Sequence, residues 1–348
     1  MNSQPNTTKF PKVCILILNW NGWKDTIECL ESVFRISYPN YQVIVIDNGS
    51  TDGSVEKIKE WAEGKQKVLT VETSHPLYNL SYPQVPKPIL YVFYKKEETE
   101  SGGNNKFSQN YPLILVQNGE NLGFAAGNNV GLRYALKKGF DYVLLLNNDT
   151  VVDKGFLSNL VKMAHDNEEA GIIGGKIYFY DKANTIQSLG VEINLKKGDN
   201  LLIGCGKLDQ GQYDYVNKVD GVSGALMLIK HDVFNKVGLL DEDYFLYTED
   251  VDFCYRVSRT AFNIIVEPKA IIWHKVSATS GSFSTTYFHY FTNNRFLFIK
   301  KHFNSKFSYK LIFAIQMIKL IIFCLKKANF KGVEAIIRGL YNGFFKIS

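Results

Sequence analysis

The stretch that decides the fold is DYVLLLNNDT, residues 141–150, in which a short apolar run ends in two asparagines and an aspartate. Such a run, rich in branched residues and closed by polar turn residues, is typical of a strand that is covered on both faces. Ligands of open α/β sheets bind beyond the carboxyl ends of such strands. The sequence therefore places the carboxylate of Asp149 at a sheet edge where a ligand is expected.

Asp149 and the nearby Asn147 carry oxygen atoms, which are the ligands that hard cations such as Mg²⁺ and Mn²⁺ prefer. These ions usually take one or two protein carboxylates and complete their coordination with substrate phosphates. One interpretation of the segment is therefore a divalent cation site, with Asp149 as a ligand and Asn147 as a weaker one. The other is a turn that only closes the strand, and these residues alone do not separate the two.

Three more apolar runs, at residues 13–18, 42–46 and 113–116, end in loops rich in Asn, Asp or Gly, and helical spacing of apolar residues follows each. Strands that alternate with helices predict an α/β fold, with a doubly wound, mostly parallel sheet flanked by helices. All of these strands then end on one edge of the sheet. Residues 72–111, which are rich in proline, interrupt the pattern, and residues 90–94 within them are predicted to add an edge strand.

The composition indicates a globular protein of the cytosol. With 348 residues, of which 45% are hydrophobic, the chain can fill the core of one large domain and carry an appendage. Its five cysteines lack C-x-x-C spacing, so neither a zinc site nor a disulfide framework is predicted. Residues 1–10 form a polar tail without the apolar segment of a signal peptide.

The basic charge is concentrated in residues 295–348, which hold eleven Lys or Arg and the single acid Glu334, a balance of +10 that leaves −4 for the rest. Residues 311–325 are apolar except for Gln316 and Lys319. A helix of 15 residues would be about 22 Å long, shorter than the roughly 30 Å of a bilayer core. We therefore expect a helix that lies in the membrane interface. The alternative is a helix packed on the protein's own core or on a second subunit of a homodimer.

The stretch YTEDVDFCYR, which starts at residue 247, holds three acids within four positions, Glu249, Asp250 and Asp252. Their mutual repulsion usually needs a cation or a functional reason. The alternative is an ordinary helix N-terminus, in which Thr248 caps the helix and acids suit the first turn. The aromatic residues around the acids favour a functional cluster, in which Arg256 orients one carboxylate through charge-assisted hydrogen bonds.

Three further features lie at expected ends of strands and helices. Asp47 directly follows the second strand, where a carboxylate can accept hydrogen bonds from a nucleotide, although turn formation explains its neighbours as well. The small residues of NLGFAAGNN, 121–129, suit an anion or polar ligand at a helix N-terminus. They match neither a Walker loop nor G-x-G-x-x-G, which argues against an NTPase or a dehydrogenase. His274 ends a short apolar strand, where a structural histidine is the commoner alternative to a ligand.

The segments VCILILNWNG, DNGSTDGS, NLGFAAGNN, LNNDT, SGA and YTEDVD follow one another in the order found in family 2 glycosyltransferases of the rhamnosyltransferase-like branch, which the chain resembles. The resemblance covers residues 11–300, with residues 72–111 as an insertion. It implies a GT-A fold over residues 11–294, followed by a basic and apolar helical extension over residues 295–348. It also implies inverting, metal-dependent transfer from a nucleoside-diphosphate sugar, and rhamnose is favoured only by this resemblance.

The resemblance also implies roles for the candidate residues. Asp149 is expected to bind the metal, His274 to complete the metal site, and Asp250 to act as the catalytic base. Asn147 stands where the common form of the motif has Asp, which leaves open the identity of the metal and the strength of its binding. The residues expected on the acceptor side, unless their role is structural, are Glu249, Asp252 and Arg256. The residues expected to bind the donor nucleotide are Asn19, Asp47, Asn48, Asn121, Gly123 and Asn128.

The expected partners are a nucleoside-diphosphate-sugar donor, a saccharide or lipid-linked glycan acceptor, and the cytoplasmic face of the cell membrane, reached through residues 295–348. Nucleic acid is not expected, because the basic tail lacks a recognisable binding module. A sugar nucleotidyltransferase would need a basic, Gly-rich loop after the first strand, where this chain offers only Lys24. A non-catalytic carbohydrate- or membrane-binding protein on the same fold would be favoured by loss of Asp149 or Asp250, and both are present.

Overall fold

The computed structural model describes most of the chain, and the statements below concern residues 10–66, 72–103, 108–194, 199–215, 217–275, 284–303 and 307–345. The polar tail expected at residues 1–10 therefore lies outside the described residues, apart from Phe10. Residues 104–107 of the expected insertion lie outside them as well.

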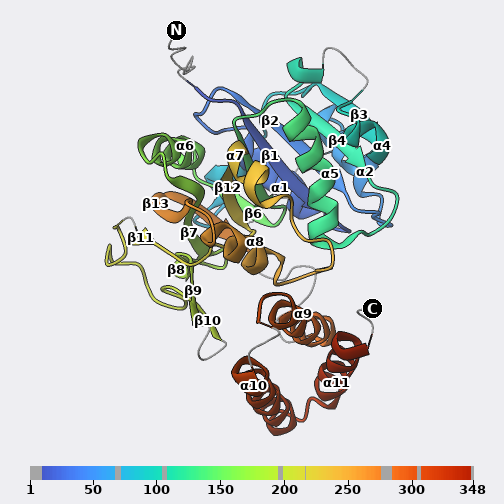
Figure 1. The fold of residues 1–348 in the computed structure, drawn as a ribbon. Helices are drawn as coiled ribbons and strands as arrows, with labels where there is room; N and C mark the ends of the chain where they lie inside the picture. The colour runs from blue at the N-terminus through green and yellow to red at the C-terminus, as the bar shows by residue number, and fades with distance from the viewer. Residues whose placement is uncertain are drawn as a thin grey trace.

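One half of the central sheet is parallel, as the apolar runs predict. Its strands stand in the order β5, β1, β2, β4, β3, and each pairs in parallel with its neighbour (Figure 1). Their bounds are β1 Val13–Asn19, β2 Tyr41–Asp47, β3 Tyr91–Lys95, β4 Leu113–Gln117 and β5 Tyr142–Asn147. The predicted edge strand within the insertion is confirmed, because β3 ends the row.

The other half of the sheet is mixed. β12 pairs antiparallel with β5 and with β7, and the long β13 then runs parallel to β7. The remaining strands are β6 Thr150–Val152, β7 Ala170–Phe179, β8 Lys182–Ser188, β9 Val191–Asn194, β10 Asp199–Leu202, β11 Asn217–Lys218, β12 Leu226–Lys230 and β13 Asn263–His274. In the polar segment after residue 190, β9 and β10 pair antiparallel with each other as a separate two-stranded sheet.

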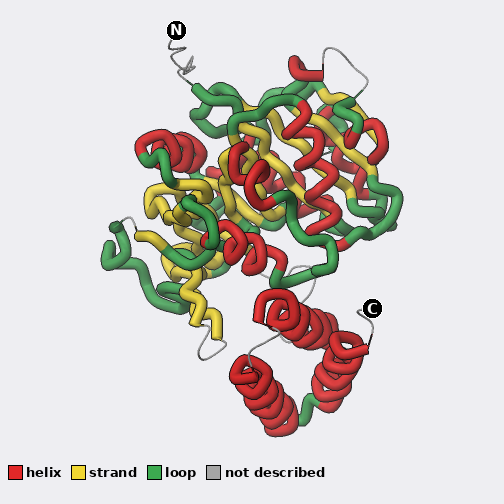
Figure 2. The backbone as a smooth tube through the Cα atoms, in the orientation of Figure 1, coloured by secondary structure: helices red, strands yellow, loops and turns green. Residues whose placement is uncertain are grey.

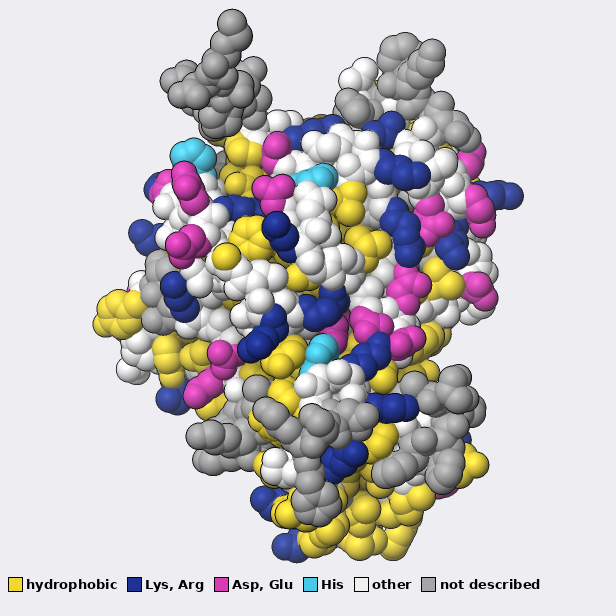
Figure 3. All heavy atoms as spheres, in the orientation of Figure 1, with side chains coloured by type: hydrophobic (Ala, Val, Ile, Leu, Met, Phe, Trp, Pro, Cys, Tyr) yellow, Lys and Arg dark blue, Asp and Glu magenta, His cyan; other side chains and the backbone are white. Residues whose placement is uncertain are grey.

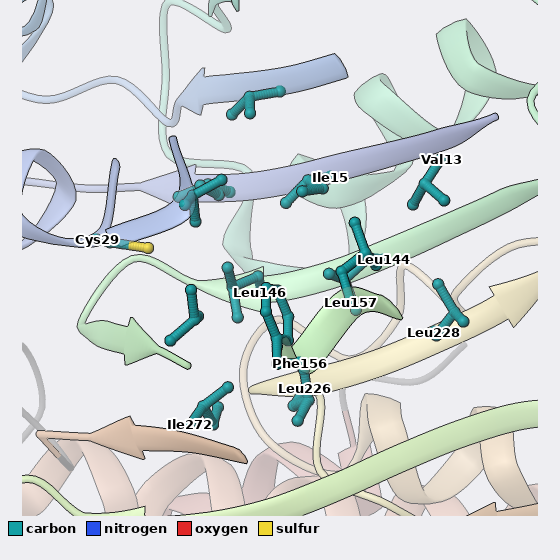
Figure 4. Packing of buried hydrophobic residues seen from close by; sticks show 14 of the residues in the cluster. Val13, Ile15, Cys29, Leu144, Leu146, Phe156, Leu157, Leu226, Leu228 and Ile272 are labelled. Carbon is teal, nitrogen blue, oxygen red and sulfur yellow. The ribbon is translucent and has the colours of Figure 1, made fainter. Parts of the chain in front are cut away.

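Helices cover both faces of the sheet (Figure 2). They are α1 Trp23–Val33, α2 Ser54–Ala62, α3 Tyr78–Ser81, α4 Lys96–Glu100, α5 Gly123–Lys137, α6 Phe156–Asp166, α7 His231–Val237 and α8 Glu249–Ser258, with a 3-10 turn at Ser108–Asn110. Alternate residues of β1 enter two separate hydrophobic clusters, Ile15 in one and Leu16 in the other (Figure 4 shows the first). Burial on both faces explains why the strand sequences are apolar without alternation.

Three helices, α9 Thr285–Phe303, α10 Phe307–Lys326 and α11 Phe330–Phe345, form a C-terminal extension below the sheet (Figure 1). The length of 15 residues expected for the apolar helix is wrong, because α10 has 20 residues and measures about 30 Å. Among the described residues, α10 is the one helix long and apolar enough to cross a membrane. Length therefore does not distinguish a crossing helix from one that lies in the interface.

One side of α10 packs inward and the other is exposed. Phe313, Met317 and Cys324 are buried in a small cluster with residues of α9 and α11. The exposed residues recur at intervals of three or four and form a stripe, here called the α10 stripe: Leu311, Ile315, Ile318, Ile322 and Leu325. The helix was predicted either to lie in the membrane interface or to pack on the protein's own core. Only the buried side of α10 packs on the protein itself, and the other side remains exposed.

A buried carboxylate on α1 holds part of the insertion against the core. Glu31 is fully buried, and it accepts hydrogen bonds from Trp61 Nε1 at 2.8 Å and from the backbone N–H of Val85 at 2.8 Å. The ammonium group of Lys87 lies 3.4 Å from Glu31 Oε1, and Arg35 lies 3.3 Å from Oε2. The proline-rich segment is thus fixed by a charge that has no access to water.

Substitution Glu31→Ala is expected to lower the free energy of unfolding by roughly 3 to 5 kcal/mol, because it leaves Lys87 and the Val85 N–H without their partner. Denaturant unfolding measures this difference. Glu60→Ala, which breaks the exposed pair with Lys57, is the control and should cost about 0 to 1 kcal/mol. Equal losses for the two variants would contradict the proposed role of Glu31.

Candidate active site

The ends of β1, β2 and β5 bring several predicted site residues together. Asn19 is the register partner of Asp47, and Leu18 is that of Asn147. Asn19 is fully buried, and its Nδ2 donates to Asp47 Oδ1 at 2.9 Å. Its Oδ1 accepts a hydrogen bond from Thr26 Oγ1 at 2.8 Å. Asn19 therefore orients Asp47 rather than pointing into open space.

Asn48 joins the loop after β2 to the loop that precedes α5. Its Nδ2 donates to Asn121 Oδ1 at 2.9 Å and to the carbonyl of Gly123 at 3.0 Å. Its Oδ1 accepts from Asn118 Nδ2 at 3.0 Å. Asn128 lies one turn into α5, where its Nδ2 donates to the carbonyl of Phe124 at 2.9 Å. Asn48 and Asn128 are buried, so their amides hold the local backbone in place.

Gly123 allows a close approach between two loops. Its φ is +80°, a left-handed value that glycine adopts readily. A Cβ at this position would lie 2.3 Å from the carbonyl oxygen of Phe245, and that oxygen accepts a hydrogen bond from Phe124 N at 2.7 Å. The loop before α8 is thereby fixed against the start of α5.

Asp149 and His274, which are 125 positions apart, meet because β6 pairs antiparallel with the end of β13. His274 Nε2 lies 3.0 Å from Asp149 Oδ1 and 3.3 Å from Asn147 Nδ2. His274 Nδ1 lies 3.0 Å from Gln187 Oε1 on β8. With that oxygen as acceptor, Nδ1 carries a hydrogen and Nε2 faces Asp149. Gln187 was not predicted as a site residue, because it lies in a polar strand without a motif.

This arrangement suits a divalent cation. Burial alone would raise the pKa of Asp149, but the charge and hydrogen bond of His274 outweigh burial and hold that pKa below its usual range. A histidine that ligates a metal usually donates its other ring N–H to an oxygen, as His274 does to Gln187. Within the described residues no group of three or more His, Cys, Asp or Glu side chains is arranged so that it could hold a metal ion by itself. Asp149 and His274 can therefore hold a cation whose other ligands come from a substrate.

A partly buried charge cluster lies next to this pair and was not predicted from the sequence. The backbone N–H of Lys275 donates to the carbonyl of Asp149 at 3.0 Å, and its ammonium group lies 2.6 Å from Asp25 Oδ1 and 2.5 Å from Glu28 Oε2. Tyr180 OH donates to Glu28 Oε1 at 2.6 Å. These contacts connect the end of β13 to α1 and so fix His274 next to Asp149.

The loop SGA, residues 223–225, connects this part of the site to α8. The backbone N–H of Asn147 donates to the carbonyl of Ala225 at 3.2 Å, and that of Gly224 donates to Asp250 Oδ2 at 3.1 Å. Asp250 Oδ1 accepts from Val251 N at 2.8 Å. Burial raises the pKa of Asp250, although these backbone hydrogen bonds act in the opposite direction.

The other two acids of α8 have different surroundings. Burial, followed by the charge of Asp250, raises the pKa of Glu249 well above its ordinary value. Asp252 is fully buried and accepts from Arg256 Nε at 2.7 Å, with His302 Nε2 of α9 also at 2.7 Å. Burial alone would raise the pKa of Asp252, but the His302 hydrogen bond and the Arg256 charge outweigh it and lower that pKa. Asp252 thus joins α8 to α9, and Arg256 joins α8 to the carbonyls of Val237 and Leu239, which favours a structural role for both residues.

The backbone enters α8 through two residues in the left-handed region, Tyr247 with φ +68° and Thr248 with φ +76°. The alternative of a helix N-terminus is correct in position, because Thr248 is the N-cap residue of α8 and the acids lie in the first turn, but the Thr248 side chain makes no capping hydrogen bond. Instead Asn294, buried on α9, donates from Nδ2 to the carbonyls of Leu246 and Tyr247, both at 2.8 Å. A left-handed non-glycine residue costs of order 1 to 3 kcal/mol and needs such support. No motif in the sequence pointed to Asn294.

Two protein-family models match the chain. The model described as "Glycosyltransferase like family 2" matches residues 79–295, and the model "Glycosyl transferase family 2" matches residues 14–77. The chain therefore belongs to glycosyltransferase family 2.

Curated relatives and solved structures agree with this assignment. The chain is 31% identical over 153 residues to the low-salt glycan biosynthesis hexosyltransferase Agl10 of Haloferax volcanii, a match that covers 44% of this chain and 48% of the relative. It is 23% identical over 269 residues to the poly-beta-1,6-N-acetyl-D-glucosamine synthase of Staphylococcus epidermidis, covering 77% of this chain and 51% of the relative. The chain thus spans about half the length of the curated relatives that it matches.

Two solved structures share the fold. The mannosyltransferase PcManGT of Pyrobaculum calidifontis, in complex with GDP-Man and Mn²⁺, aligns with a TM-score of 0.55 at 13% identity and covers 98% of this chain and 89% of its own. GalNAc-T7 with UDP, GalNAc and Mn²⁺ aligns with a TM-score of 0.55 at 12% identity, covering 84% of this chain and 48% of its own. The prediction of a GT-A type sheet with a C-terminal helical extension is confirmed.

Substitution Asn294→Ala is expected to lower the free energy of unfolding by about 1 to 3 kcal/mol, because two backbone carbonyls before α8 lose their donor. Denaturant unfolding measures the loss, and amide hydrogen exchange should rise around residues 246–252. Asn235→Ala, on the exposed side of α7, is the control and should stay within about 0.5 kcal/mol of wild type. Unchanged exchange before α8 in Asn294→Ala would refute the support described here.

Proposed function

We propose that the chain is an inverting glycosyltransferase that moves a hexose from a nucleoside-diphosphate sugar to a hydroxyl group of a saccharide or lipid-linked glycan. The observation that carries this proposal is the arrangement of Asp149, His274 and Asp250 at one edge of the sheet, joined through the hydrogen bonds of residues 223–225. These hydrogen bonds link the proposed cation site to the proposed base, which supports the proposal. Family membership supports transferase chemistry at this place.

Asp250 is the proposed base. Its carboxylate is held by two backbone N–H groups, so it has a fixed direction, and burial strengthens it as a base by raising its pKa. It accepts the proton of the acceptor hydroxyl while that oxygen attacks the anomeric carbon and the bond to the diphosphate breaks. One displacement of this kind inverts the anomeric configuration. Glu249, whose pKa is raised by burial and by Asp250, adds little negative charge beside the base.

Asp149 and His274 are proposed to hold Mg²⁺ or Mn²⁺, with Asn147 in contact with the histidine. When bound, the cation supplies positive charge against the departing diphosphate. Gln187 keeps Nε2 of His274 directed at Asp149. Two proteins of this fold were solved with Mn²⁺, which supports a divalent ion here. Asp47, oriented by Asn19, is proposed to contact the nucleotide, with Asn48, Asn121, Gly123 and Asn128 shaping the loops around it.

The donor is proposed from relatives and sequence motifs together. The named relatives are a hexosyltransferase of glycan biosynthesis and a polysaccharide synthase, which support a hexose donor and a glycan product. The proposal that the transferred sugar is rhamnose is supported by the order of the sequence motifs alone. Residues 11–294 are proposed as the catalytic domain, with residues 72–111 as an insertion and residues 295–348 as the extension.

The first test measures release of nucleoside diphosphate from a panel of nucleotide sugars, with Mg²⁺, Mn²⁺ or a chelator. Wild type should turn over one donor slowly without acceptor, and a chelator or Asp149→Ala should abolish that turnover, because the diphosphate then lacks its counter-charge. Asp250→Asn should slow transfer to an acceptor by about 10² to 10⁴, the usual contribution of a general base. Nuclear magnetic resonance spectroscopy of the product shows whether its anomeric configuration is opposite to that of the donor.

The matched control is Asp232→Asn, an acid in the first turn of α7, which should leave transfer unchanged. The rate of transfer should fall as pH drops through the raised pKa of Asp250, because the protonated carboxyl cannot accept a proton. The midpoint of this fall in rate is expected above pH 3.8, because 3.8 is the ordinary pKa of an aspartate and that of Asp250 is raised. The fall should be absent in Asp250→Asn. No turnover and no metal-dependent donor binding across the panel would sink the transferase proposal and favour a binding protein on this fold.

The extension is proposed to hold the enzyme at the cytoplasmic face of the cell membrane. Hydrophobic side chains gather at the end of the molecule that α10 and α11 form (Figure 3). Besides the α10 stripe, α11 also has exposed hydrophobic residues, Phe330, Ile337 and Tyr341. The excess of Lys and Arg in residues 295–348 adds attraction to anionic lipid. A second copy of the chain covering this surface is the alternative.

A shortened chain that ends at Phe303, and so keeps α9, should no longer sediment with vesicles of anionic phospholipid, while it still turns over donor. The double substitution Ile318→Ser and Ile322→Ser in the α10 stripe should weaken sedimentation without shortening the chain. Undiminished sedimentation of the shortened chain would contradict membrane attachment through α10 and α11. Light scattering that shows a dimer for the full chain and a monomer for the shortened one would favour the second copy.

A further inference from the structure

The proline-rich insertion begins with a segment, residues 75–81, that lies against the candidate cation site. Leu77 is buried in one small hydrophobic cluster with Val151 of β6 and with Tyr180. Val151 lies two residues after Asp149, in the strand that pairs with the end of β13. The short helix α3, which follows Leu77, contacts both α1 and β6. The start of the insertion is therefore packed on the strand that follows one of the two candidate ligands.

Tyr180, in the turn between β7 and β8, connects this segment to the charged groups beside the site. Its ring stacks on the imidazole of His75, with 5.0 Å between the ring centroids. Its hydroxyl donates to Glu28 Oε1 at 2.6 Å, and the ammonium group of Lys275 lies 4.9 Å from its ring centroid. Its backbone N–H donates to the carbonyl of His274 at 3.0 Å. One residue thus contacts the insertion, the charge cluster and a candidate ligand.

The charge cluster carries more negative than positive charge. The ammonium group of Lys275 lies 2.6 Å from Asp25 Oδ1 and 2.5 Å from Glu28 Oε2, while the backbone N–H of Lys275 donates to the carbonyl of Asp149. Ser81 of α3 places its hydroxyl 3.5 Å from Glu28 Oε1. Because Glu28 is 3% exposed, water and salt screen its charge poorly. Two carboxylates and one ammonium group therefore favour a cation bound beside them.

We propose that residues 75–81 set the affinity of the candidate cation site for its ion, with Tyr180 and Glu28 as the positioning residues. The cation site itself rests on the proposed function, whereas the contacts that reach it are those of the chain. With the insertion packed in place, Tyr180 holds Glu28 on Lys275, and Lys275 holds the end of β13 against α1. Without these contacts the two candidate ligands are held less precisely, which lowers the affinity for a cation.

The test measures the affinity of the full-length protein for Mn²⁺ by electron paramagnetic resonance, in which the free ion gives the signal. Tyr180→Phe keeps the ring and removes the hydrogen bond to Glu28, whereas Glu28→Gln keeps the shape and removes the charge. Each should weaken Mn²⁺ binding by roughly 10- to 100-fold, the loss typical of outer partners of metal ligands. Leu77→Ala, which opens a cavity between the insertion and β6, should weaken it by about tenfold, the lower end of that range.

Two matched controls separate positioning from stability. Tyr38→Phe removes the hydroxyl of another buried tyrosine, which donates to the carbonyl of Pro11. Ile89→Ala removes a buried apolar side chain of the insertion that packs in a different hydrophobic cluster from Leu77. Both controls should lose stability in denaturant unfolding and still bind Mn²⁺ as wild type does, because a merely structural role does not change metal affinity while the protein is folded. Equal weakening of Mn²⁺ binding by the controls would overturn the proposal.

Asp149→Ala separates this proposal from the proposed function, because it removes a candidate ligand itself. Loss of Mn²⁺ binding in Asp149→Ala, together with wild-type affinity in Tyr180→Phe and Glu28→Gln, would overturn the role of the insertion and leave the cation site standing. Loss in Asp149→Ala with weakened binding in both positioning variants is the expected result. Mn²⁺ binding that is absent from wild type, or that survives Asp149→Ala, would count against the cation site and the role of the insertion together.

Discussion

The pairing of β6 with the end of β13 is the contact on which the site depends. The three residue pairs of this short ladder bring His274 next to Thr150 and therefore next to Asp149. Around it, Lys275 binds two carboxylates of α1 and Gln187 holds the far side of the imidazole ring. The carboxylate and the imidazole are thus positioned before any ligand arrives, so little reorganisation is needed when a charged substrate binds.

Three acids lie in the first turn of α8, and the fold reduces their mutual repulsion by giving each one a different environment. Asp252 is directed into the protein and paired with Arg256 and His302. Glu249 is buried, and its raised pKa favours the neutral form. Asp250 is the acid held by backbone N–H groups of both Gly224 and Val251. The three acids therefore differ in environment, and the carboxylate of Asp250 is held by backbone N–H groups whereas that of Asp252 pairs with a guanidinium group, a difference that residue spacing did not show.

The sequence predicted the parallel half of the sheet because strands buried on both faces must be continuously apolar, as in residues 142–146. It also predicted Asp47 and Asp149 at the carboxyl ends of strands, where β2 ends at Asp47 and β5 ends just before Asp149, because strand ends are local features. Gln187 and Asn294 could not be found in the same way, because each acts through a partner far away in the chain. The length of α10 was underestimated because its first turn, with Ser308 and Lys310, is polar but still helical.

The contact between α9 and the loop before α8 has a consequence for how such enzymes diversify. A boundary drawn after residue 294 from motif similarity would cut α9 in two and separate Asn294, which binds the loop before α8, from His302, which binds Asp252. Helix α9 joins two parts of the protein, because it contacts α8 and the loop before α8 and also packs against α10 and α11. A chimaera of two relatives is therefore expected to keep the support of the loop before α8 only when α9 and that loop come from the same parent.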